Sequence, residues 1–297
     1  MANLDENPYF KPDYAHVAAR GLRVVQLQSI NTAVIVRPTP VGQAFDAIGP
    51  YPLARVRAPV CVQGLRDELK DNGLVTLSWV QDPFEVLPPE AKGFDLKRAY
   101  KIHHVYDRER GDPVFPGIHQ RNTKRALKLC SVREIDLQDH LEAWCGLYDN
   151  LIQRQSLTEA HAFDQAYFES LANIVGFRTL GAFVDETLVS AHIWSCAGDR
   201  AYSHLAASSA TGYKAGAAYA VNAFALSHFA GYRFLNFGGV PDGGNAEGLE
   251  GFKKGFANTT REAFLCGAVG DRAEYDALNL VGASGKSRSS YFPAYRA

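Results

Sequence analysis

The sequence predicts an α/β (α+β) protein of two similar domains, each a mixed, mostly antiparallel twisted sheet flanked by helices. The chain has 297 residues, which is long for one core but comfortable for two domains of roughly 120 to 170 residues. Both halves read in the same order: helix, β-meander, helix, strand, excursion, strand. Such a repeat at domain scale indicates duplication. We therefore expect one domain over 1–112 and a second over 113–297.

The second half shows the clearer pattern. Apolar residues recur at three- and four-residue spacing from Leu137 to Ile152, after Asp136, which predicts a helix with one apolar face and Asp136 as its N-cap. Polar turns then separate three β-type segments, which predicts an antiparallel meander. The expected elements are helices over 137–152 and 164–175, strands over 179–184, 188–195 and 200–208, an alanine-rich helix over 214–230, a strand over 233–237, a short helix over 249–256 and a strand over 261–266.

The first half reads as a weaker copy. Its expected elements are a helix over 13–20, strands over 23–28, 33–37 and 53–57, a helix over 62–70, and strands over 74–80 and 98–106. A polar, basic helix over 114–130 either links the halves or opens the second one. Several superfolds share this outline of meander, crossover helix and further strands, so the fold alone does not assign a function.

Composition narrows the class of protein. With 46% hydrophobic and 21% charged residues, the chain is typical of soluble globular proteins. The acidic N-terminus has no signal-peptide pattern, and no apolar run approaches the roughly 20 residues of a membrane span. We therefore expect a cytoplasmic protein without membrane insertion. We also expect a monomer. A net charge of −1 means that any nucleic-acid contact must be local. The five scattered cysteines show no ligand spacing and predict structural thiols and no metal site.

The strongest local feature is a glycine-rich segment that follows a predicted strand. Four glycines fall within the seven residues 238–244, at a position where the lip of a ligand cleft is common because glycine lets backbone N–H groups approach a substrate. A flexible turn would have the same composition. Lys253 beside Phe252 follows on a short predicted helix and could stabilise an oxyanion during acyl transfer, although such lysines are more often a solvated helix face.

A second constellation lies on the predicted helix over 114–130. Arg121, Lys124, Arg125 and Lys128 recur at i, i+3, i+4 and i+7 and give one face four positive charges. This face suits a polyphosphate or an RNA backbone, or it is a solvated linker helix. His103-His104 lies on a predicted strand, where neighbouring side chains point to opposite faces, so both cannot line one site.

Four stretches resemble the Fem-type (FemABX-like) aminoacyl transferases, which join two acetyltransferase-like (GNAT-like) domains and move an amino acid from aminoacyl-tRNA to an amine. The segment from Gly248-Leu249 through Phe252-Lys253 and Phe256 matches the "GL..FK..F" signature of that family and is the most specific. The other three are the basic helix at 121–128, the arginine-then-"YF" segment spanning 153–168, and the meander and alanine-rich helix that lead to Phe237-Gly238-Gly239.

The resemblance implies roles for individual residues. Lys253, aided by Phe252, would stabilise the tetrahedral intermediate as an amine attacks the aminoacyl ester. Arg154 would lie in the acceptor-binding cleft, with Tyr202, Gly238 and Gly239 also binding substrate. The basic face of Arg121, Lys124, Arg125 and Lys128 would meet RNA or a nucleotide-linked acceptor.

The resemblance also implies an activity. The chain would form a peptide bond on a peptidoglycan precursor or a peptide antibiotic, with aminoacyl-tRNA as co-substrate and no cofactor. Two alternatives stay open from the residues: an acyl-CoA-dependent N-acyltransferase of the same fold, and a non-catalytic duplicated binding module.

Overall fold

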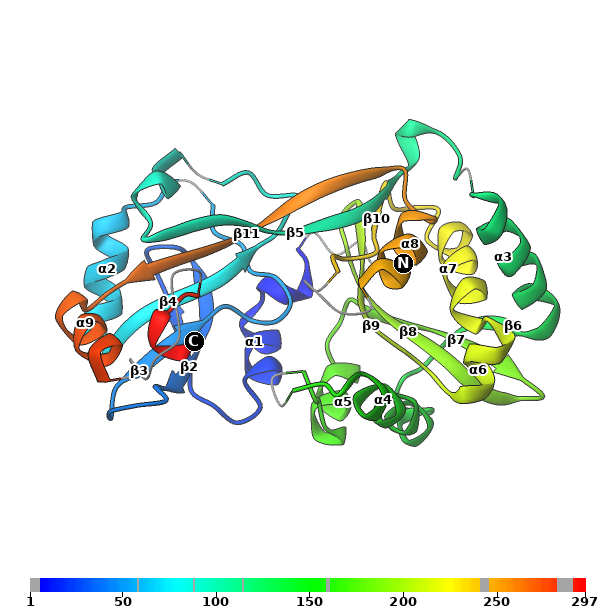
Figure 1. Ribbon diagram of the computed structural model, residues 1–297, viewed down its shortest axis with the longest axis horizontal. Coiled ribbons are helices and arrows are strands. Elements are labelled where there is room, and N and C mark those ends of the chain that lie inside the picture. The colour runs from blue at the N-terminus through cyan, green and yellow to red at the C-terminus, as the bar shows by residue number, and fades with distance from the viewer. Residues whose placement is uncertain are drawn as a thin grey trace. The chain divides into compact units, whose positions relative to one another are not determined.

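The computed structural model describes residues 6–57, 59–87, 89–113, 115–158, 161–240, 246–281 and 291–297 (Figure 1). The chain divides into two compact units. The first unit comprises Tyr9–Lys101 and Glu262–Ala297, and the second comprises Met1–Pro8 and Ile102–Arg261. This division differs from the expected domains 1–112 and 113–297, because two strands, β5 (Leu96–Asp107) and β11 (Thr259–Val269), each run from one unit into the other. The order of elements along the chain gives no sign that a single strand contributes residues to both units, so the expected boundary missed this arrangement.

The first unit holds a mixed sheet in the strand order β1-β2-β3-β4-β11. Only β3 and β4 run parallel within this order. Leu65 and Leu69 bury the apolar face of helix α2 in a core with Leu77 and Trp79. The elements are β1 (Val24–Leu27), β2 (Thr32–Pro38), β3 (Phe45–Ile48), β4 (Leu74–Gln81) and β11, with helices α1 (Pro12–Ala19), α2 (Val62–Asp71) and α9 (Arg272–Val281). Short 3₁₀ turns occur at Pro8–Phe10, Pro89–Gly93 and Ala294–Arg296.

The second unit holds a sheet in the strand order β5-β10-β9-β8-β7-β6, in which β9 and β10 form the single parallel pair. Its strands, besides β5, are β6 (Ser131–Ile135), β7 (Phe177–Val184), β8 (Thr187–Ala197), β9 (Arg200–Ser208) and β10 (Phe234–Asn236). Its helices are α3 (Gly117–Leu129), α4 (Leu141–Gln155), α5 (Gln165–Ala172), α6 (Ala210–Ala215), α7 (Ala217–His228) and α8 (Ala246–Lys254), with a 3₁₀ turn at Arg108–Arg110.

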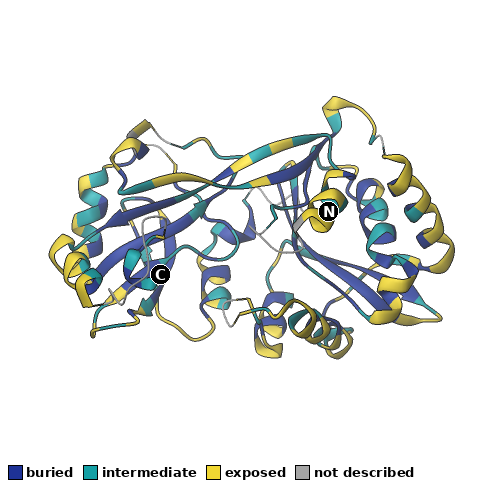
Figure 2. Cartoon of the chain, viewed as in Figure 1, coloured by how far each residue is buried: buried dark blue, intermediate teal, exposed yellow. Residues whose placement is uncertain are grey.

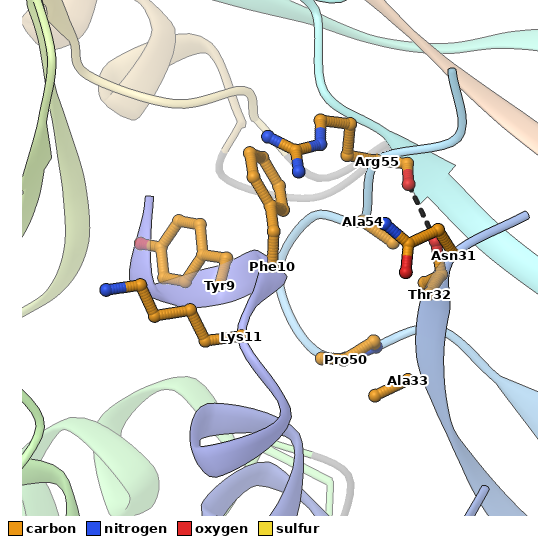
Figure 3. Close-up of a pocket in the computed structure, with 9 residues that line it drawn as sticks. All are labelled: Tyr9, Phe10, Lys11, Asn31, Thr32, Ala33, Pro50, Ala54 and Arg55. Carbon is orange, nitrogen blue, oxygen red and sulfur yellow. Dashed lines mark hydrogen bonds between the residues drawn. The ribbon is translucent and has the colours of Figure 1, made fainter. Parts of the chain in front are cut away.

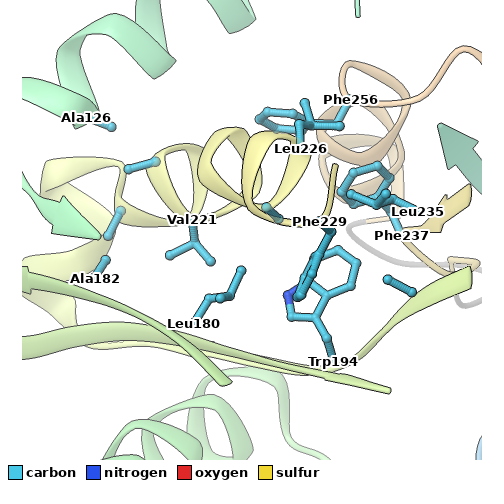
Figure 4. Close-up of a cluster of buried hydrophobic side chains, with 14 of the residues drawn as sticks. Ala126, Leu180, Ala182, Trp194, Val221, Leu226, Phe229, Leu235, Phe237 and Phe256 are labelled. Atoms are coloured by element: carbon cyan, nitrogen blue, oxygen red, sulfur yellow. The ribbon is translucent and has the colours of Figure 1, made fainter. Parts of the chain in front are cut away.

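Helices cover both faces of this second sheet. Helix α7 packs on β7 and β8, while α4 packs on β8 and β9 from the opposite side (Figure 1). On the α7 side, Trp194 stands at the centre of a buried cluster with Phe229 and Phe237 (Figure 4). Strands β7, β8, β9 and β10 are mostly buried, while the outward helix faces are exposed (Figure 2). The expected fold class, a mixed and mostly antiparallel sheet flanked by helices, is confirmed.

Most expected elements are present, and three expectations were wrong. The third strand of the first meander is Phe45–Ile48, not 53–57, where only Ala54 forms an isolated bridge. Asp46 of β3 is fully buried and forms ion pairs with Arg37 and Arg296. The sequence does not predict this strand, because an aspartate normally indicates a surface position.

The alanine-rich helix over 214–230 is two helices, because Gly216 has φ +72° and ends α6 before α7 begins. The helix expected from 137 begins at Leu141, and the Asp136 carboxylate instead accepts a hydrogen bond from the Gln138 N–H in the preceding turn. Strand β6 and helix α9 were not predicted.

Candidate active site

Lys253 is held against the end of strand β10 in the second unit. After Asn236 the strand gives way to Phe237-Gly238-Gly239, and helix α8 brings Lys253 back to this segment. The Lys253 Nζ donates a hydrogen bond to the Gly239 carbonyl oxygen at 2.6 Å, and its side chain is half-buried. The structure therefore brings together three predicted site residues, Lys253, Gly238 and Gly239. The later glycines, Gly243 and Gly244, lie outside the described residues.

The conformation of Gly238 is fixed by its neighbour Asn236. Gly238 has φ +78°, and its N–H donates to the Asn236 Oδ1 at 2.8 Å. Asn236 is 2% exposed, and its Nδ2 lies 3.1 Å from the His103 Nδ1. A Cβ atom on Gly238 would lie 3.3 Å from the Lys253 Nζ. Glycine at this position permits both the left-handed backbone and the close approach of the lysine.

Phe252, the neighbour of Lys253, anchors helix α8. Its ring stands perpendicular to the Tyr219 ring of α7 with centroids 4.9 Å apart, and its carbonyl oxygen lies 3.1 Å from the His119 Nε2 of α3. Gly255 lies close to the same imidazole, since a Cβ there would be 2.0 Å from the His119 Nε2. Phe252 thus fixes the helix that carries Lys253.

Two buried imidazoles, those of His104 and His192, feel the charge of Lys253. Burial lowers the pKa of His104, with Glu250 opposing the shift and the charge of Lys253 adding to it. Burial lowers the pKa of His192 to about 4, with Lys253 again contributing and Asn222 opposing. Both rings are therefore neutral at pH 7, and the Nδ1 of each is enclosed without a hydrogen-bond partner among the described residues. A neutral imidazole in such a place can accept or donate a proton.

The side chains of His103 and His104 lie on opposite faces of strand β5, as expected for neighbouring residues of a strand. His103 contacts Asn236, whereas His104 faces the charges of α8. The sequence predicted that His103 and His104 point to opposite faces, but it gave no sign of the partners of either residue. It also gave no sign of His192 or Asn222, because these residues lie on strand β8 and helix α7, far from Lys253 in the sequence.

The remaining predicted residues lie at other places in the second unit. Tyr202 is 2% exposed on β9, paired in register with Asn236. Arg154 ends helix α4, is exposed, and places its guanidinium carbon 3.9 Å from the centroid of the Tyr213 ring. The basic side chains of α3 are all exposed: Arg121, Lys124, Arg125 and Lys128.

A small pocket in the first unit contains none of the predicted site residues (Figure 3). Phe10 and Arg55 stand at its wall, with the Arg55 guanidinium carbon 4.8 Å from the Phe10 ring centroid. The Thr32 Oγ1 donates to the Arg55 carbonyl oxygen at 2.7 Å and closes one side. The charged residues of the pocket, Lys11 and Arg55, are both cations, and no carboxylate or imidazole lines it to form an acid–base pair, so we assign it no function.

The described ranges hold no candidate metal site and no candidate membrane-spanning helix. No group of three or more His, Cys, Asp or Glu side chains in those ranges is placed to hold a metal ion. No helix within them combines the length and apolar character that a membrane crossing requires. The five cysteines are free thiols, of which Cys61 is exposed.

Comparison with known proteins identifies the fold. No family model matches the sequence, and no curated protein matches it either. Solved structures do match. FemX shares 11% identity with a TM-score of 0.65, over 93% of this chain and 95% of that chain.

The chain has the fold of FemX.

The same fold recurs in two further solved structures. One is the C-terminal domain of a putative lysylphosphatidylglycerol synthetase from Agrobacterium fabrum, with 15% identity and a TM-score of 0.61 over 91% of this chain and 89% of that chain. The other is L-PGS from Bacillus licheniformis, with 13% identity and a TM-score of 0.56 over 93% of this chain and 97% of that chain. At such identities the likeness establishes the fold, and the chemistry has to be argued from the site.

Proposed function

We propose that this chain is a Fem-type acyltransferase that moves an amino acid from aminoacyl-tRNA to the amine of a peptide acceptor. The observation that carries the proposal is the Lys253 ammonium, held 2.6 Å from the Gly239 carbonyl oxygen at a glycine-lined strand end. The match of Gly248-Leu249, Phe252-Lys253 and Phe256 to the Fem signature supports the same assignment. The acceptor is a peptidoglycan precursor or a peptide antibiotic.

Aminoacyl transfer from an ester to an amine is accelerated by one positive charge held beside the carbonyl oxygen of the ester. A neutral acceptor amine attacks the ester carbonyl carbon, a C–N bond forms, and negative charge collects on the former carbonyl oxygen. The ester C–O bond then breaks, and the proton lost by the amine ends on the leaving ribose oxygen. Interactions accelerate this step only where they are stronger in the charged transition state than with bound substrate.

Lys253 suits that role because of how it is held. An ammonium has three N–H donors, so its bond to Gly239 is compatible with donation to a substrate oxygen. The half-buried position strengthens the interaction, since charges attract more strongly where water is excluded. Phe252 supports the lysine through its packing on Tyr219, and the neutral imidazoles of His104 and His192 add no competing positive charge.

Substrate binding is divided among the other predicted residues. Gly238 and Gly239 present backbone groups beside Lys253, and Tyr202 lies in register with Asn236 behind them. The exposed basic face of α3 is the RNA-binding candidate. None of Arg121, Lys124, Arg125 and Lys128 forms an ion pair within the ranges that the structure describes. Their charges are therefore not neutralised by neighbouring carboxylates there.

Donor consumption tests the proposal directly. The protein is incubated with bulk charged tRNA and, separately, with acetyl-CoA, together with a mixture of peptide amines. We expect loss of the aminoacyl ester from the tRNA, abolished by prior RNase treatment, and no consumption of acetyl-CoA. RNase-resistant consumption of acetyl-CoA would instead identify an acyl-CoA N-acyltransferase. Consumption of neither donor would contradict a catalytic role and favour a binding module.

A further inference from the structure

Helix α6 joins an exposed aromatic residue to two helices that bear positive charge. Its consecutive residues Tyr213 and Lys214 contact different partners. The Arg154 guanidinium of α4 lies over the Tyr213 ring at 3.9 Å, and the Arg125 Nη2 of α3 donates to the Lys214 carbonyl oxygen at 3.1 Å. The sequence placed Arg154 and Arg125 in separate motifs, and the fold makes both of them neighbours of helix α6.

Exposed positive side chains of α3 and α4 thus meet at helix α6, which defines a positive surface. We call it the α3–α6–α4 basic surface, and its members are Arg121, Lys124, Arg125, Lys128, Lys214, Tyr213 and Arg154. Each of these side chains is exposed. In the described part of the chain none of the six cations forms an ion pair. In a chain of net charge −1, this local excess is the feature that a polyanion would recognise.

The Arg154–Tyr213 pair places a guanidinium group and an aromatic ring together at the surface, and a site that binds only phosphate needs no aromatic ring. The guanidinium carbon of Arg154 lies over the Tyr213 ring at cation–π distance, and Tyr213 is 44% exposed. Unpaired nucleic-acid bases stack on aromatic rings and on guanidinium planes, while phosphates of the same strand meet lysines and arginines. A folded acidic protein would use the charges but has no flat base to place on the pair.

We propose that the α3–α6–α4 basic surface binds RNA, with phosphates along α3 and Lys214 and an unpaired base stacked on the Arg154–Tyr213 pair. The inference rests on the proposed function, since it names the surface that meets the donor RNA. It assigns Tyr213 and Lys214 a role and makes Arg154 a contact to the donor rather than to the acceptor.

Binding to two RNAs tests the stack. One is a short blunt duplex, and the other is the same duplex with an unpaired single-stranded 3′ extension. We expect Tyr213→Ala to weaken binding of the extended RNA about tenfold, as loss of one base–aromatic stack does, and to leave the blunt duplex unchanged. Tyr213→Phe keeps the ring and is the matched control, which should bind both RNAs as the wild type does. Equal affinity of wild type and Tyr213→Ala for the extended RNA would overturn the stacking site.

Salt dependence tests the phosphate contacts separately. Replacing Lys124 or Lys214 by Gln should reduce the slope of log affinity against log salt by about one for each lysine. Arg154→Lys keeps the charge but loses the planar group, so we expect the salt slope to persist while the preference for the unpaired extension falls. Unchanged salt slopes for Lys124→Gln and Lys214→Gln would show that these lysines are solvated and do not contact phosphates.

The catalytic variant separates this inference from the proposed function. Lys253→Ala lies outside the surface and should bind both RNAs normally. A wild-type protein that binds RNA as described but consumes no charged tRNA contradicts the proposed function and leaves the surface intact. A wild-type protein that consumes charged tRNA while the Tyr213 and Lys214 variants bind normally contradicts the surface alone.

Discussion

The Nζ of Lys253 and the carbonyl oxygen of Gly239 lie 2.6 Å apart, joining the last turn of helix α8 to the end of strand β10. The bond places an ammonium beside a backbone that only glycine accommodates, since Gly238 has φ +78° and lies within reach of the same nitrogen. A surface lysine has no need of such a partner. This contact is the observation on which the proposed catalytic role of Lys253 rests.

Removal of the ammonium should act on turnover. We expect Lys253→Ala to lower the turnover number by roughly 10²- to 10³-fold, because one charge that stabilises the oxyanion is lost. Substrate affinity should change little, since the contact is strongest in the transition state. Steady-state kinetics with saturating donor and acceptor measures both quantities.

The neighbouring lysine provides the control. Lys254 lies in the same helical turn but is exposed, so Lys254→Ala should keep nearly the full turnover. Wild-type turnover in Lys253→Ala, under the same conditions, would make Lys253 the surface charge of the alternative reading.

Gly238 should tolerate no side chain. In Gly238→Ala the backbone keeps a positive φ at a cost of about 1–2 kcal/mol, and the new Cβ would meet the Lys253 Nζ at 3.3 Å. We expect a turnover loss of at least tenfold, because small displacements of a catalytic group are costly. Gly231→Ala is the matched control, since a Cβ there meets no atom within 4 Å. Equal turnover in the two variants would show that the Gly238 backbone does not position Lys253.

Asn236 should act through the glycine turn. Asn236→Leu removes the acceptor of the Gly238 N–H in a buried place, which costs about 1–3 kcal/mol of unfolding free energy. Asn236→Asp retains an oxygen for that N–H and should recover most of the turnover lost in Asn236→Leu. Denaturant unfolding and steady-state kinetics check the two effects. If Asn236→Asp is as inactive as Asn236→Leu, the amide serves something other than the Gly238 N–H.

The sequence predicted the parts of this site that lie in one short segment. Gly238 and Gly239 belong to one predicted motif, Phe252 and Lys253 belong to the next, and the structure brings Lys253 to Gly239. Asn236 directly precedes that motif, but an asparagine before glycines reads as an ordinary turn residue. Its contact with His103 depends on the pairing of β10 with β5, which no local pattern specifies.

The same limit explains the fold. The local sequence pattern predicted the meander of β7, β8 and β9, because polar turns between β-type segments are a local signal. It missed the break at Gly216, since small alanines continue on both sides and a single glycine is tolerated within helices. It also missed the juxtaposition of Arg154 and Tyr213, which lie on different helices and meet only after the sheet has formed.

Buried histidines should make the free energy of unfolding of the second unit depend on pH between about pH 5 and 6.5. Carboxylates titrate at lower pH. Burial lowers the pKa of His192 to about 4 and that of His204 to about 3. In the unfolded chain both titrate near 6.5. Below about pH 6.5 the unfolded state therefore binds protons that the folded state refuses, and the free energy of unfolding falls as pH falls. The loss from each histidine continues until its folded pKa is reached.

Urea unfolding at pH 7, 6 and 5 measures this slope. We expect a loss approaching about 1.4 kcal/mol per pH unit for each histidine at the acid end of the range. Carboxylates do not obscure it: the hydrogen bond from Arg178 lowers the pKa of Glu134, so its contribution is lost only below the unfolded value of 4.5. His204→Gln removes one titrating group, and its slope should be shallower than that of the wild type. Identical unfolding free energies at pH 7 and pH 5 would show that these imidazoles accept protons in the folded state and that their burial is incomplete in solution.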